Sequence, residues 1–268
     1  MKIGFIGTGN MGGAIMRGYG KYAAERGDEL YGFNRTRSKL EAVCRDSGAS
    51  PLGSIGEVVE TCDIFVISME PKQIREHISE ITEKYDSSKL AVSIAAGVTI
   101  DWLESHFGKD AMIVRVMPNM PIRVGEGMAS LSRNSKVTDR MFTKVLEIFE
   151  AAGRAEETDE DIINTIGAVS GSSPAYTYMY IDAMARCGEA NGMEYDQAVR
   201  FAAQSVLGAA KVVLESDDTP HDLAMSVCTE GGSTIEGYNV LKENGFEKDI
   251  QDGLQAAIDK NISMSKGE

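Results

Sequence analysis

Hydrophobic residues in the first half of the chain form short runs that are separated by amphipathic or charged stretches. Such alternation predicts strands connected by helices. Several runs are apolar throughout, which is typical of strands that helices cover on both faces of a parallel sheet. The predicted strands are Lys2–Ile6, Glu29–Phe33, Ile64–Ser68, Leu90–Ile94 and Met112–Met117. This half therefore predicts a doubly wound α/β domain.

The pattern changes after Thr158, where apolar residues recur at helical spacing. Two nearly repeated series carry this signal: Tyr176, Met179, Tyr180, Ala183, Met184 and Cys187, then Ala198, Phe201, Ala202, Val206 and Ala209. The second half is therefore predicted to be all-helical. The polar, acidic segment 153–161 is the predicted boundary, which gives domains of residues 1–158 and 159–268.

The helical half is rich in Ala, Met, Tyr and Gly on its apolar faces. A unit of about 110 residues with several such faces has difficulty burying all of them within one chain. We therefore expect this half to form a homodimer or a higher homo-oligomer. The alternative is a self-contained helical bundle that packs on the sheet domain.

Composition excludes several classes of function. A formal net charge of −14 and a pI near 4.8 disfavour binding to nucleic acid or to an acidic membrane. Four cysteines lie far apart without a CxxC pair, and only three histidines are present, so we expect no metal site and a reducing compartment. The N-terminal residues resemble neither a secretion signal nor a membrane anchor. These features predict a cytoplasmic protein.

A glycine-rich loop follows the first predicted strand and opens a predicted helix. Its residues are Gly7, Thr8, Gly9, Asn10, Met11 and Gly12. In a dinucleotide-binding fold, the first glycine of GxGxxG makes the tight turn, the second admits the diphosphate, and the third allows close packing of helix and strand. The alternative is a plain strand-to-helix turn. The position between strand and helix favours a dinucleotide site.

The end of the second predicted strand carries information on the cofactor. NAD sites commonly place an Asp or Glu there to accept from the ribose 2′-hydroxyl, and a carboxylate would repel a 2′-phosphate. This chain instead has Asn34, Arg35, Thr36 and Arg37. Neutral donors and positive charge favour NADPH, with NADH as the weaker alternative. Solvated loop arginines are the competing interpretation.

Taken together, the motifs resemble those of the pyrroline-5-carboxylate reductase family in both content and order along the whole chain. The matching landmarks are Gly7–Gly12, Asn34–Thr36, Pro71, Ser93–Gly97, Arg115–Pro121, Gly171–Ala175 and Gly231–Ile235. The resemblance implies a Rossmann-type N-terminal domain, a helical dimerisation domain and active sites between them. It also implies NADPH-dependent reduction of L-1-pyrroline-5-carboxylate to L-proline, the last step of proline biosynthesis.

Three residues depart from the family's pattern. Glu70 stands where a lysine usually precedes the proline, Ser173 replaces a glycine, and Glu230 replaces the proline before the double glycine. They motivate two alternatives: a reductase of another cyclic imine or of a hydroxy acid on the same fold, and a nucleotide-binding regulatory protein with little turnover.

The resemblance implies that Thr234 is the catalytic residue, with its hydroxyl at the imine nitrogen. The substrate-binding residues are then Thr229, Gly231, Gly232, Ser233 and Thr234, because amides at a helix N-terminus hold a carboxylate. The same segment fits the capping box, in which Ser233 caps the helix and Glu236 reciprocates. The two interpretations are compatible.

Further residues are expected to border the cofactor at the ends of the later strands: Ser68, Met69, Pro71, Ala95, Gly97 and Asn119. Small residues such as Ala95 and Gly97 let a cofactor approach, although tight strand–helix packing uses the same residues. Asn119 is a candidate contact to the nicotinamide ribose or the substrate. A purely conformational role in the Pro118–Pro121 loop is its alternative.

Overall fold

The computed structural model describes residues 1–266, which form two compact units. The first unit holds Met1–Ser172 together with the described residues from Ala257 onward, and the second holds Ser173–Ala256. Residues 160–172 thus belong with the sheet by their contacts, and the chain returns to the first unit near its end.

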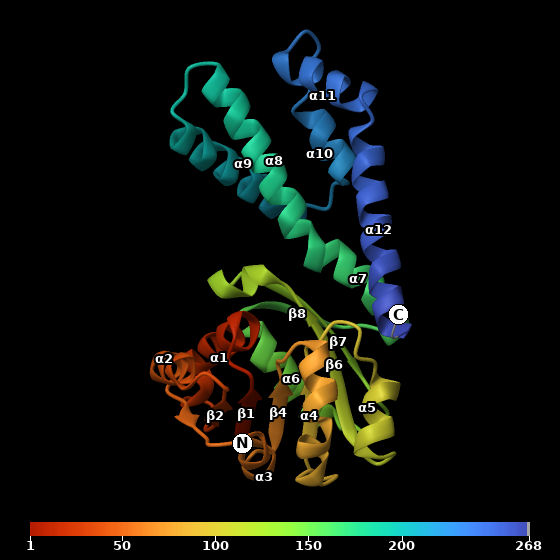
Figure 1. Cartoon of the computed structure of the whole chain (residues 1–268). Helices are drawn as coiled ribbons and strands as arrows, with labels where there is room; N and C mark the ends of the chain where they lie inside the picture. Colours follow the sequence, from red (N-terminus) through yellow and green to blue (C-terminus); the bar gives the residue numbers. More distant parts are fainter. Residues whose placement is uncertain (267–268) are drawn as a thin grey trace. The chain divides into compact units, whose positions relative to one another are not determined.

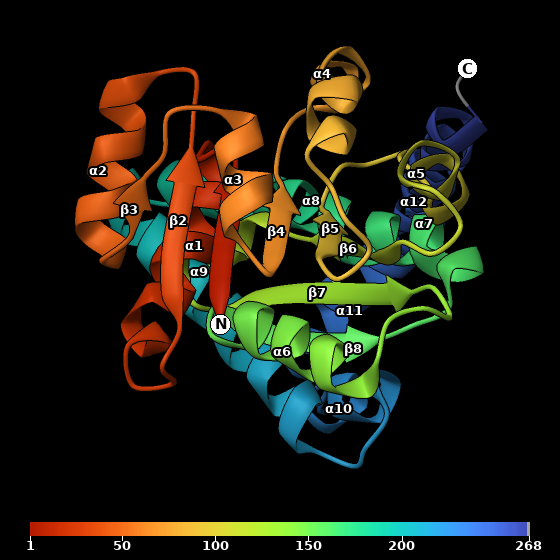
Figure 2. The ribbon, with the colours of Figure 1, turned by 90° about the horizontal axis from the view of Figure 1, so that it is seen from below.

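The first unit is built on a sheet of eight strands in the order β3-β2-β1-β4-β5-β6-β7-β8. All neighbours are parallel except β6 and β7. Figure 2 shows β2, β1 and β4 side by side. The strands are β1 (Lys2–Ile6), β2 (Glu29–Phe33), β3 (Ser50–Pro51), β4 (Ile64–Ile67), β5 (Leu90–Ser93), β6 (Met112–Pro118), β7 (Gly127–Arg133) and β8 (Gly153–Glu157).

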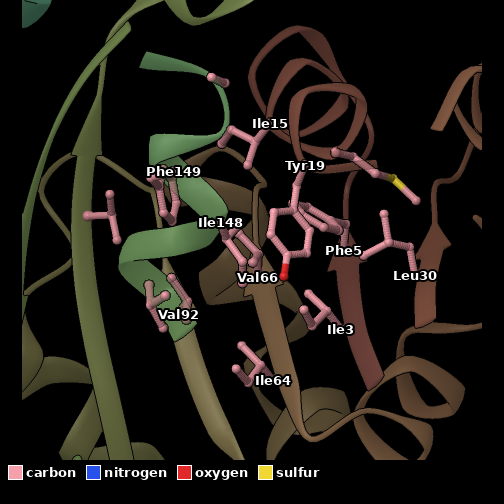
Figure 3. Close-up of a cluster of buried hydrophobic side chains, with 14 of the residues drawn as sticks. Ile3, Phe5, Ile15, Tyr19, Leu30, Ile64, Val66, Val92, Ile148 and Phe149 are labelled. Carbon is pink, nitrogen blue, oxygen red and sulfur yellow. The ribbon is translucent and has the colours of Figure 1, made fainter. Parts of the chain in front are cut away.

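Helices cover both faces of this sheet, as the continuous apolar runs predict. One face packs against α1 (Asn10–Ala23), α2 (Arg37–Ser47) and α6 (Asp139–Glu150), and the other against α3 (Ile55–Thr61), α4 (Pro71–Glu83) and α5 (Ile100–Phe107). Alternate residues of β4 serve the two cores: Val66 lies in the first and Phe65 in the second. Figure 3 shows part of the first core, with Tyr19 of α1 beside Phe5 and Ile148.

All five predicted strands are confirmed, and three more were missed. β8 corrects the sequence analysis most clearly, because Gly153–Glu157 is not linker but an edge strand parallel to β7. An edge strand needs few apolar residues, and in β8 only Ala155 packs against the core. β7 was missed because it alternates small and polar residues, although Ala129 and Leu131 are buried.

Two buried charged groups brace the first unit. The Asp28 carboxylate is almost fully buried, and it accepts hydrogen bonds from Tyr19 Oη, from Lys144 Nζ at 3.0 Å and from the Met1 amino group at 2.7 Å. Arg115 on β6 is also buried and forms an ion pair with Glu160 at 2.8 Å.

The end of the chain is held by the first unit through Asn164 of α7 (Ile163–Ile166). The Asn164 carbonyl accepts from Asn261 Nδ2 at 3.0 Å, and its side-chain Oδ1 accepts from Ser265 Oγ at 3.0 Å. Arg115 also donates to Oδ1 of Asn164. A π-helical segment, Gly167–Ser172, follows α7.

The second unit is helical, as predicted. Its helices are α8 (Ser173–Ala190), α9 (Tyr195–Glu215), α10 (Pro220–Ser226), α11 (Ser233–Glu243) and the first part of α12 (Phe246–Lys266), labelled in Figure 1. Buried residues in α8 and α9 are alanines, namely Ala185, Ala198 and Ala202. Met179 and Phe201 of the predicted apolar series are exposed by 71% and 67%. This unit therefore leaves much of its apolar surface uncovered in a single chain.

In the part of the chain that the structure describes, no helix is both long enough and apolar enough to cross a membrane. Within the same residues, no three His, Cys, Asp or Glu side chains are grouped so that they could hold a metal ion. All four cysteines are free thiols.

Candidate cofactor and substrate sites

The three glycines of the loop after β1 have different physical roles. Gly7 adopts a left-handed φ of +95°, and a Cβ there would lie 2.6 Å from the Ser68 carbonyl oxygen. A Cβ on Gly12 would collide with Ser68 Oγ and the Gly7 carbonyl oxygen. Gly9 has open space where its Cβ would be. Gly7 thus makes the tight turn, Gly12 lets helix α1 pack closely, and Gly9 leaves space for a ligand to approach the backbone. A dinucleotide site requires these three roles.

Ser68 fixes this loop from the neighbouring strand. Its hydroxyl lies within hydrogen-bonding distance of both the Ile6 carbonyl oxygen, at 3.0 Å, and the Gly7 carbonyl oxygen. Helix α1 then begins after its N-cap, Gly9, with no acidic residue in its first turn. The helix N-terminus can therefore attract an anion without competition from a local carboxylate.

The turn after β2 is tied to the same loop. Asn34 Oδ1 accepts from the Thr8 amide at 3.3 Å, and Asn34 Nδ2 donates to the Thr36 carbonyl oxygen at 3.1 Å. Thr36 is the N-cap of α2, yet its side chain makes no capping hydrogen bond. Asn34 is thus a brace, whereas the Thr36 hydroxyl is available to a ligand.

Arg35 and Arg37 differ in position. Arg35 is exposed and lines a cavity beside the glycine loop. Arg37 instead donates to Glu41 at 2.9 Å within α2 and does not line the cavity. The structure therefore favours the interpretation of Arg37 as a solvated surface residue, because it forms an i,i+4 ion pair with Glu41 and lies outside the lining of the cavity.

The cavity has a volume of about 700 Å³ and extends along the carboxyl ends of β1, β2 and β4. The predicted cofactor residues that line it are Gly7, Gly9, Asn10, Met11, Asn34, Arg35, Thr36, Ser68 and Met69. Its position at the carboxyl edge of a parallel sheet is where open α/β folds bind nucleotides. The glycine loop and the turn after β2 thus form one site.

Sequence reasoning missed one wall of this cavity. Gln73, His77 and Glu80 line it from α4. They are spaced i, i+4, i+7, so they share one face of that helix, and this spacing was the available signal. His77 Nδ1 lies 3.3 Å from Glu80 Oε2. Lys39, Ile94, Ala96, Met117 and Pro118 also line the cavity.

Six predicted cofactor residues do not line the cavity: Thr8, Gly12, Pro71, Ala95, Gly97 and Asn119. Thr8 lines a neighbouring hollow of about 970 Å³ instead. Pro71 is the first residue of α4, and its neighbour Glu70 is the N-cap, whose amide donates to Gln73 Oε1 at 3.4 Å. The departure from lysine at position 70 thus has a local role as a helix cap.

Gly97 and Asn119 have structural partners within the first unit. Gly97 has a φ of +74°, and a Cβ there would lie 3.0 Å from the Met264 carbonyl oxygen in α12. Asn119 is buried, with Oδ1 accepting from the Met128 amide at 2.8 Å and Nδ2 donating to the Ser170 carbonyl oxygen at 3.0 Å. Both geometries favour the structural interpretation of these residues, which position the loops that follow β5 and β6.

In the second unit, a tight turn precedes α11. The Gly232 amide donates to the Thr229 carbonyl oxygen at 3.0 Å, and Gly231 has a φ of +72°. These features match a type II β-turn with Glu230 at its second position and glycine at its third. A Cβ on Gly232 would lie 2.6 Å from Thr229 Oγ1, so this position also needs glycine.

Helix α11 begins at Ser233, and its N-cap is Gly232. The capping box expected from Ser233 and Glu236 is therefore wrong, since a glycine occupies the cap position and no side chain caps the helix. Thr234 is exposed in the first turn. The amides at this helix start consequently remain available to an anion, and the Thr234 hydroxyl lies on the surface of the unit.

Comparison with known proteins places this geometry in a class. Residues 2–97 match the family model described as NADP oxidoreductase, coenzyme F420-dependent, and residues 160–264 match the model described as pyrroline-5-carboxylate reductase dimerisation. The fold and its cavity thus define an oxidoreductase with an NADP-binding α/β domain, residues 2–157, followed by a helical dimerisation domain.

Relatives that match the whole chain show which family of oxidoreductases it belongs to. The chain is 40% identical over 265 residues to the pyrroline-5-carboxylate reductase of Escherichia coli, covering 99% of this chain and 98% of that one. The Coxiella burnetii pyrroline-5-carboxylate reductase superposes with a TM-score of 0.90 at 29% identity, covering 98% of each chain. The Plasmodium falciparum pyrroline carboxylate reductase with NADP bound superposes with a TM-score of 0.88 at 29% identity, covering 99% of this chain and 98% of that one. The chain belongs to the pyrroline-5-carboxylate reductase family.

Proposed function

We propose that this chain reduces L-1-pyrroline-5-carboxylate to L-proline with NADPH, as the last step of proline biosynthesis. The observation that carries the proposal is the full-length similarity to reductases of this name, at 40% identity in one case, in a chain that keeps the dinucleotide cavity and Thr234. The reaction adds a hydride to the ring carbon of the C=N bond and a proton to the nitrogen.

The residues of the cavity fit a nicotinamide dinucleotide with a 2′-phosphate. When bound, NADPH supplies the hydride. Amides of the loop Gly7–Gly12 and the α1 N-terminus hold the diphosphate, and the free approach at Gly9 supports this assignment. Arg35 and the Thr36 hydroxyl bind the 2′-phosphate, with Asn34 bracing their turn. NADH, which lacks this phosphate, is the weaker alternative.

The start of α11 holds the substrate. The amides of Gly232, Ser233 and Thr234 bind its carboxylate, the turn at Gly231 orients them, and Thr229 adds a hydroxyl donor. The Thr234 hydroxyl hydrogen-bonds the imine nitrogen and orients the ring for hydride addition. The substrate can enter as a protonated iminium, so orientation matters more than a strong acid.

The uncovered apolar surface of the helical unit supports a homodimer, because exposed residues such as Met179 and Phe201 become buried when two copies associate. We assign residues 1–158 to cofactor binding and 159–268 to substrate binding and dimerisation. A cytoplasmic location belongs to the same proposal and rests on the four unpaired thiols, which suit a reducing compartment.

The departures from the family's pattern leave two other functions to be tested. Glu70 has a structural role as the α4 N-cap, which weakens the case for lost turnover. Ser173 is the first residue of α8 and accepts at its carbonyl from Thr177 Oγ1 at 2.9 Å. Glu230 adds a carboxylate to the turn before α11, and this residue is the main reason to test related substrates.

The test is a panel of purified substrates with each cofactor. NADPH oxidation is followed with pyrroline-5-carboxylate, its six-membered homologue and pyrroline-2-carboxylate. For a set of small hydroxy acids, which would be oxidised, the reduction of NADP⁺ is followed instead. We expect the highest kcat/KM with pyrroline-5-carboxylate and NADPH. Preference for another ring or a hydroxy acid would redirect the function, and tight NADPH binding without turnover would favour a regulatory protein.

A further inference from the structure

We propose that Lys39 is a second cation for the 2′-phosphate and helps Arg35 to select NADPH. The inference rests on the proposed cofactor and adds a specificity-determining residue that the sequence motif did not include. Lys39 lies in the first turn of α2 and lines the same cavity as Arg35 and Thr36.

Helix geometry brings Lys39 to the correct side of α2. Thr36 is the N-cap, and the Lys39 amide donates to the Thr36 carbonyl oxygen at 3.1 Å. Residues three apart are neighbours on a helix surface, so Lys39 shares a face with the unused Thr36 hydroxyl. Leu40, the next residue, faces the core. Arg37 projects to a different side, where it is paired with Glu41.

The charges around the cavity are separated by element. Arg35 and Lys39 contribute positive charge from the β2–α2 turn and from α2. Glu70 and Glu80 contribute negative charge from the N-cap and body of α4, and His77 lies against Glu80. Figure 2 shows α2 and α4 as separate helices. An added phosphate group is therefore favoured at α2 rather than at α4.

Ion pairing distinguishes Lys39 from Arg17, which lines the neighbouring hollow, and from Lys72 in the first turn of α4. Within residues 1–266, neither Arg35 nor Lys39 takes part in an ion pair, whereas Arg17 is paired with Asp46 at 2.8 Å and Lys72 lies 4.0 Å from Glu76. Lys39 also lines the neighbouring hollow together with Gly9 and Asn10. Its exposed side chain thus stands free between the phosphate loop and the 2′-phosphate turn.

The experiment measures binding of nucleotide fragments, which does not depend on turnover. Calorimetry compares adenosine 2′,5′-bisphosphate with adenosine 5′-monophosphate for the wild type, Lys39→Gln, Lys39→Arg, Arg35→Gln and the control Arg37→Gln. We expect Lys39→Gln to weaken binding of the bisphosphate about fivefold, as for the loss of an exposed charge pair, and to leave the affinity for the monophosphate unchanged. Lys39→Arg should retain binding, and Arg37→Gln should match the wild type.

A second readout is the dependence on salt. Loss of one cation should make bisphosphate affinity fall less steeply as ionic strength rises, because less of the binding is electrostatic. If Lys39→Gln binds both fragments like the wild type while Arg35→Gln loses the bisphosphate, Lys39 has no such role and the cofactor assignment stands. If the wild type does not prefer the bisphosphate, both the NADPH preference and the role of Lys39 are wrong.

Discussion

The Thr8 amide donates to Oδ1 of Asn34 at 3.3 Å, so the glycine loop after β1 and the turn after β2 are joined by one side chain. The Nδ2 atom of the same side-chain amide donates to the Thr36 carbonyl oxygen at 3.1 Å. Asn34 therefore fixes the positions of two segments to which we assign different parts of a dinucleotide.

Replacing Asn34 with alanine should weaken the binding of NADPH and of NADH to a similar degree. The substitution removes hydrogen bonds worth about 1 kcal/mol, or roughly fivefold in affinity, and it loosens both loops at once. Fluorescence titration with each cofactor measures the ratio of the two dissociation constants. Arg35→Gln is the comparison, since it should lower NADPH affinity selectively. A selective loss of NADPH in Asn34→Ala would instead indicate direct contact with the 2′-phosphate.

Replacing Thr234 with alanine should lower kcat by roughly ten- to a thousand-fold, the range for the loss of one oriented hydrogen-bonding group at the reacting atoms. Thr234→Ser should recover much of the rate, because the hydroxyl returns. The matched control is Thr219→Ala, whose hydroxyl caps α10 by accepting from the Asp222 amide at 3.2 Å. That control should lose about 1 kcal/mol of stability and keep its kcat. Unchanged turnover in Thr234→Ala would remove Thr234 from the mechanism.

Glu230→Pro should lower the KM for pyrroline-5-carboxylate and raise thermal stability. Proline suits the second position of a type II turn, and restricting the unfolded chain contributes about 0.4–1 kcal/mol. Removing the carboxylate also relieves repulsion of the substrate's own carboxylate. Glu230→Ala separates the two effects, because it should lower KM without the gain in Tm. A raised KM in both variants would show that the glutamate assists recognition of the substrate.

Asp28→Asn should destabilise the first unit by about 3 kcal/mol, because it removes the buried carboxylate that the Met1 amino group, Tyr19 and Lys144 all contact. Lys144 keeps its ion pair with Glu147 at 2.7 Å in this variant. Burial opposes ionisation of Asp28, but hydrogen bonds from the Met1 amino group, Tyr19 and Lys144 outweigh it and lower the pKa of the carboxyl. A depressed pKa stabilises the fold above the unfolded value near pH 4, and this contribution is lost as the pH falls through the folded value.

Urea unfolding at a series of pH values tests this account of Asp28. The difference between wild type and Asp28→Asn should be full at neutral pH and should shrink below about pH 4. Asp46→Asn is the matched control, because its pair with Arg17 is exposed and should contribute less than about 1 kcal/mol. A difference that stays constant down to pH 2 would assign the effect to packing instead of charge.

The sequence was most informative where burial and periodicity act together. β1 and β2 were predicted with the observed bounds, because after a first charged residue their residues are apolar or small, and turn signals follow them. β8 could not be recognised in this way, since an edge strand can carry Arg154 and Glu156 without burying them. Helices α8 and α9 were found by periodicity, but much of the predicted apolar face is exposed in the single chain.

The parts of the candidate site that consist of short sequence motifs were predicted. The roles of residues that depend on contacts with distant parts of the chain were missed. The glycine loop and the residues Asn34–Thr36 follow from short spacings in the sequence. Gly97 must be small because the Met264 carbonyl oxygen, far along the chain, lies against it. The side-chain amide of Asn119 forms hydrogen bonds with the backbone of Met128 and Ser170. No local sequence pattern indicates contacts with partners so far along the chain. The role proposed for Lys39 likewise could not be inferred before the residues that line the cavity were known.

The most direct test of the central claim follows the transferred hydrogen. Purified protein is incubated with pyrroline-5-carboxylate and NADPH that carries deuterium at both C4 positions, and the product is analysed by mass spectrometry and NMR. The account predicts L-proline that is one mass unit heavier, with a single deuterium on C5 and one equivalent of NADP⁺ formed. Absence of proline, or proline without deuterium from the cofactor, would contradict it.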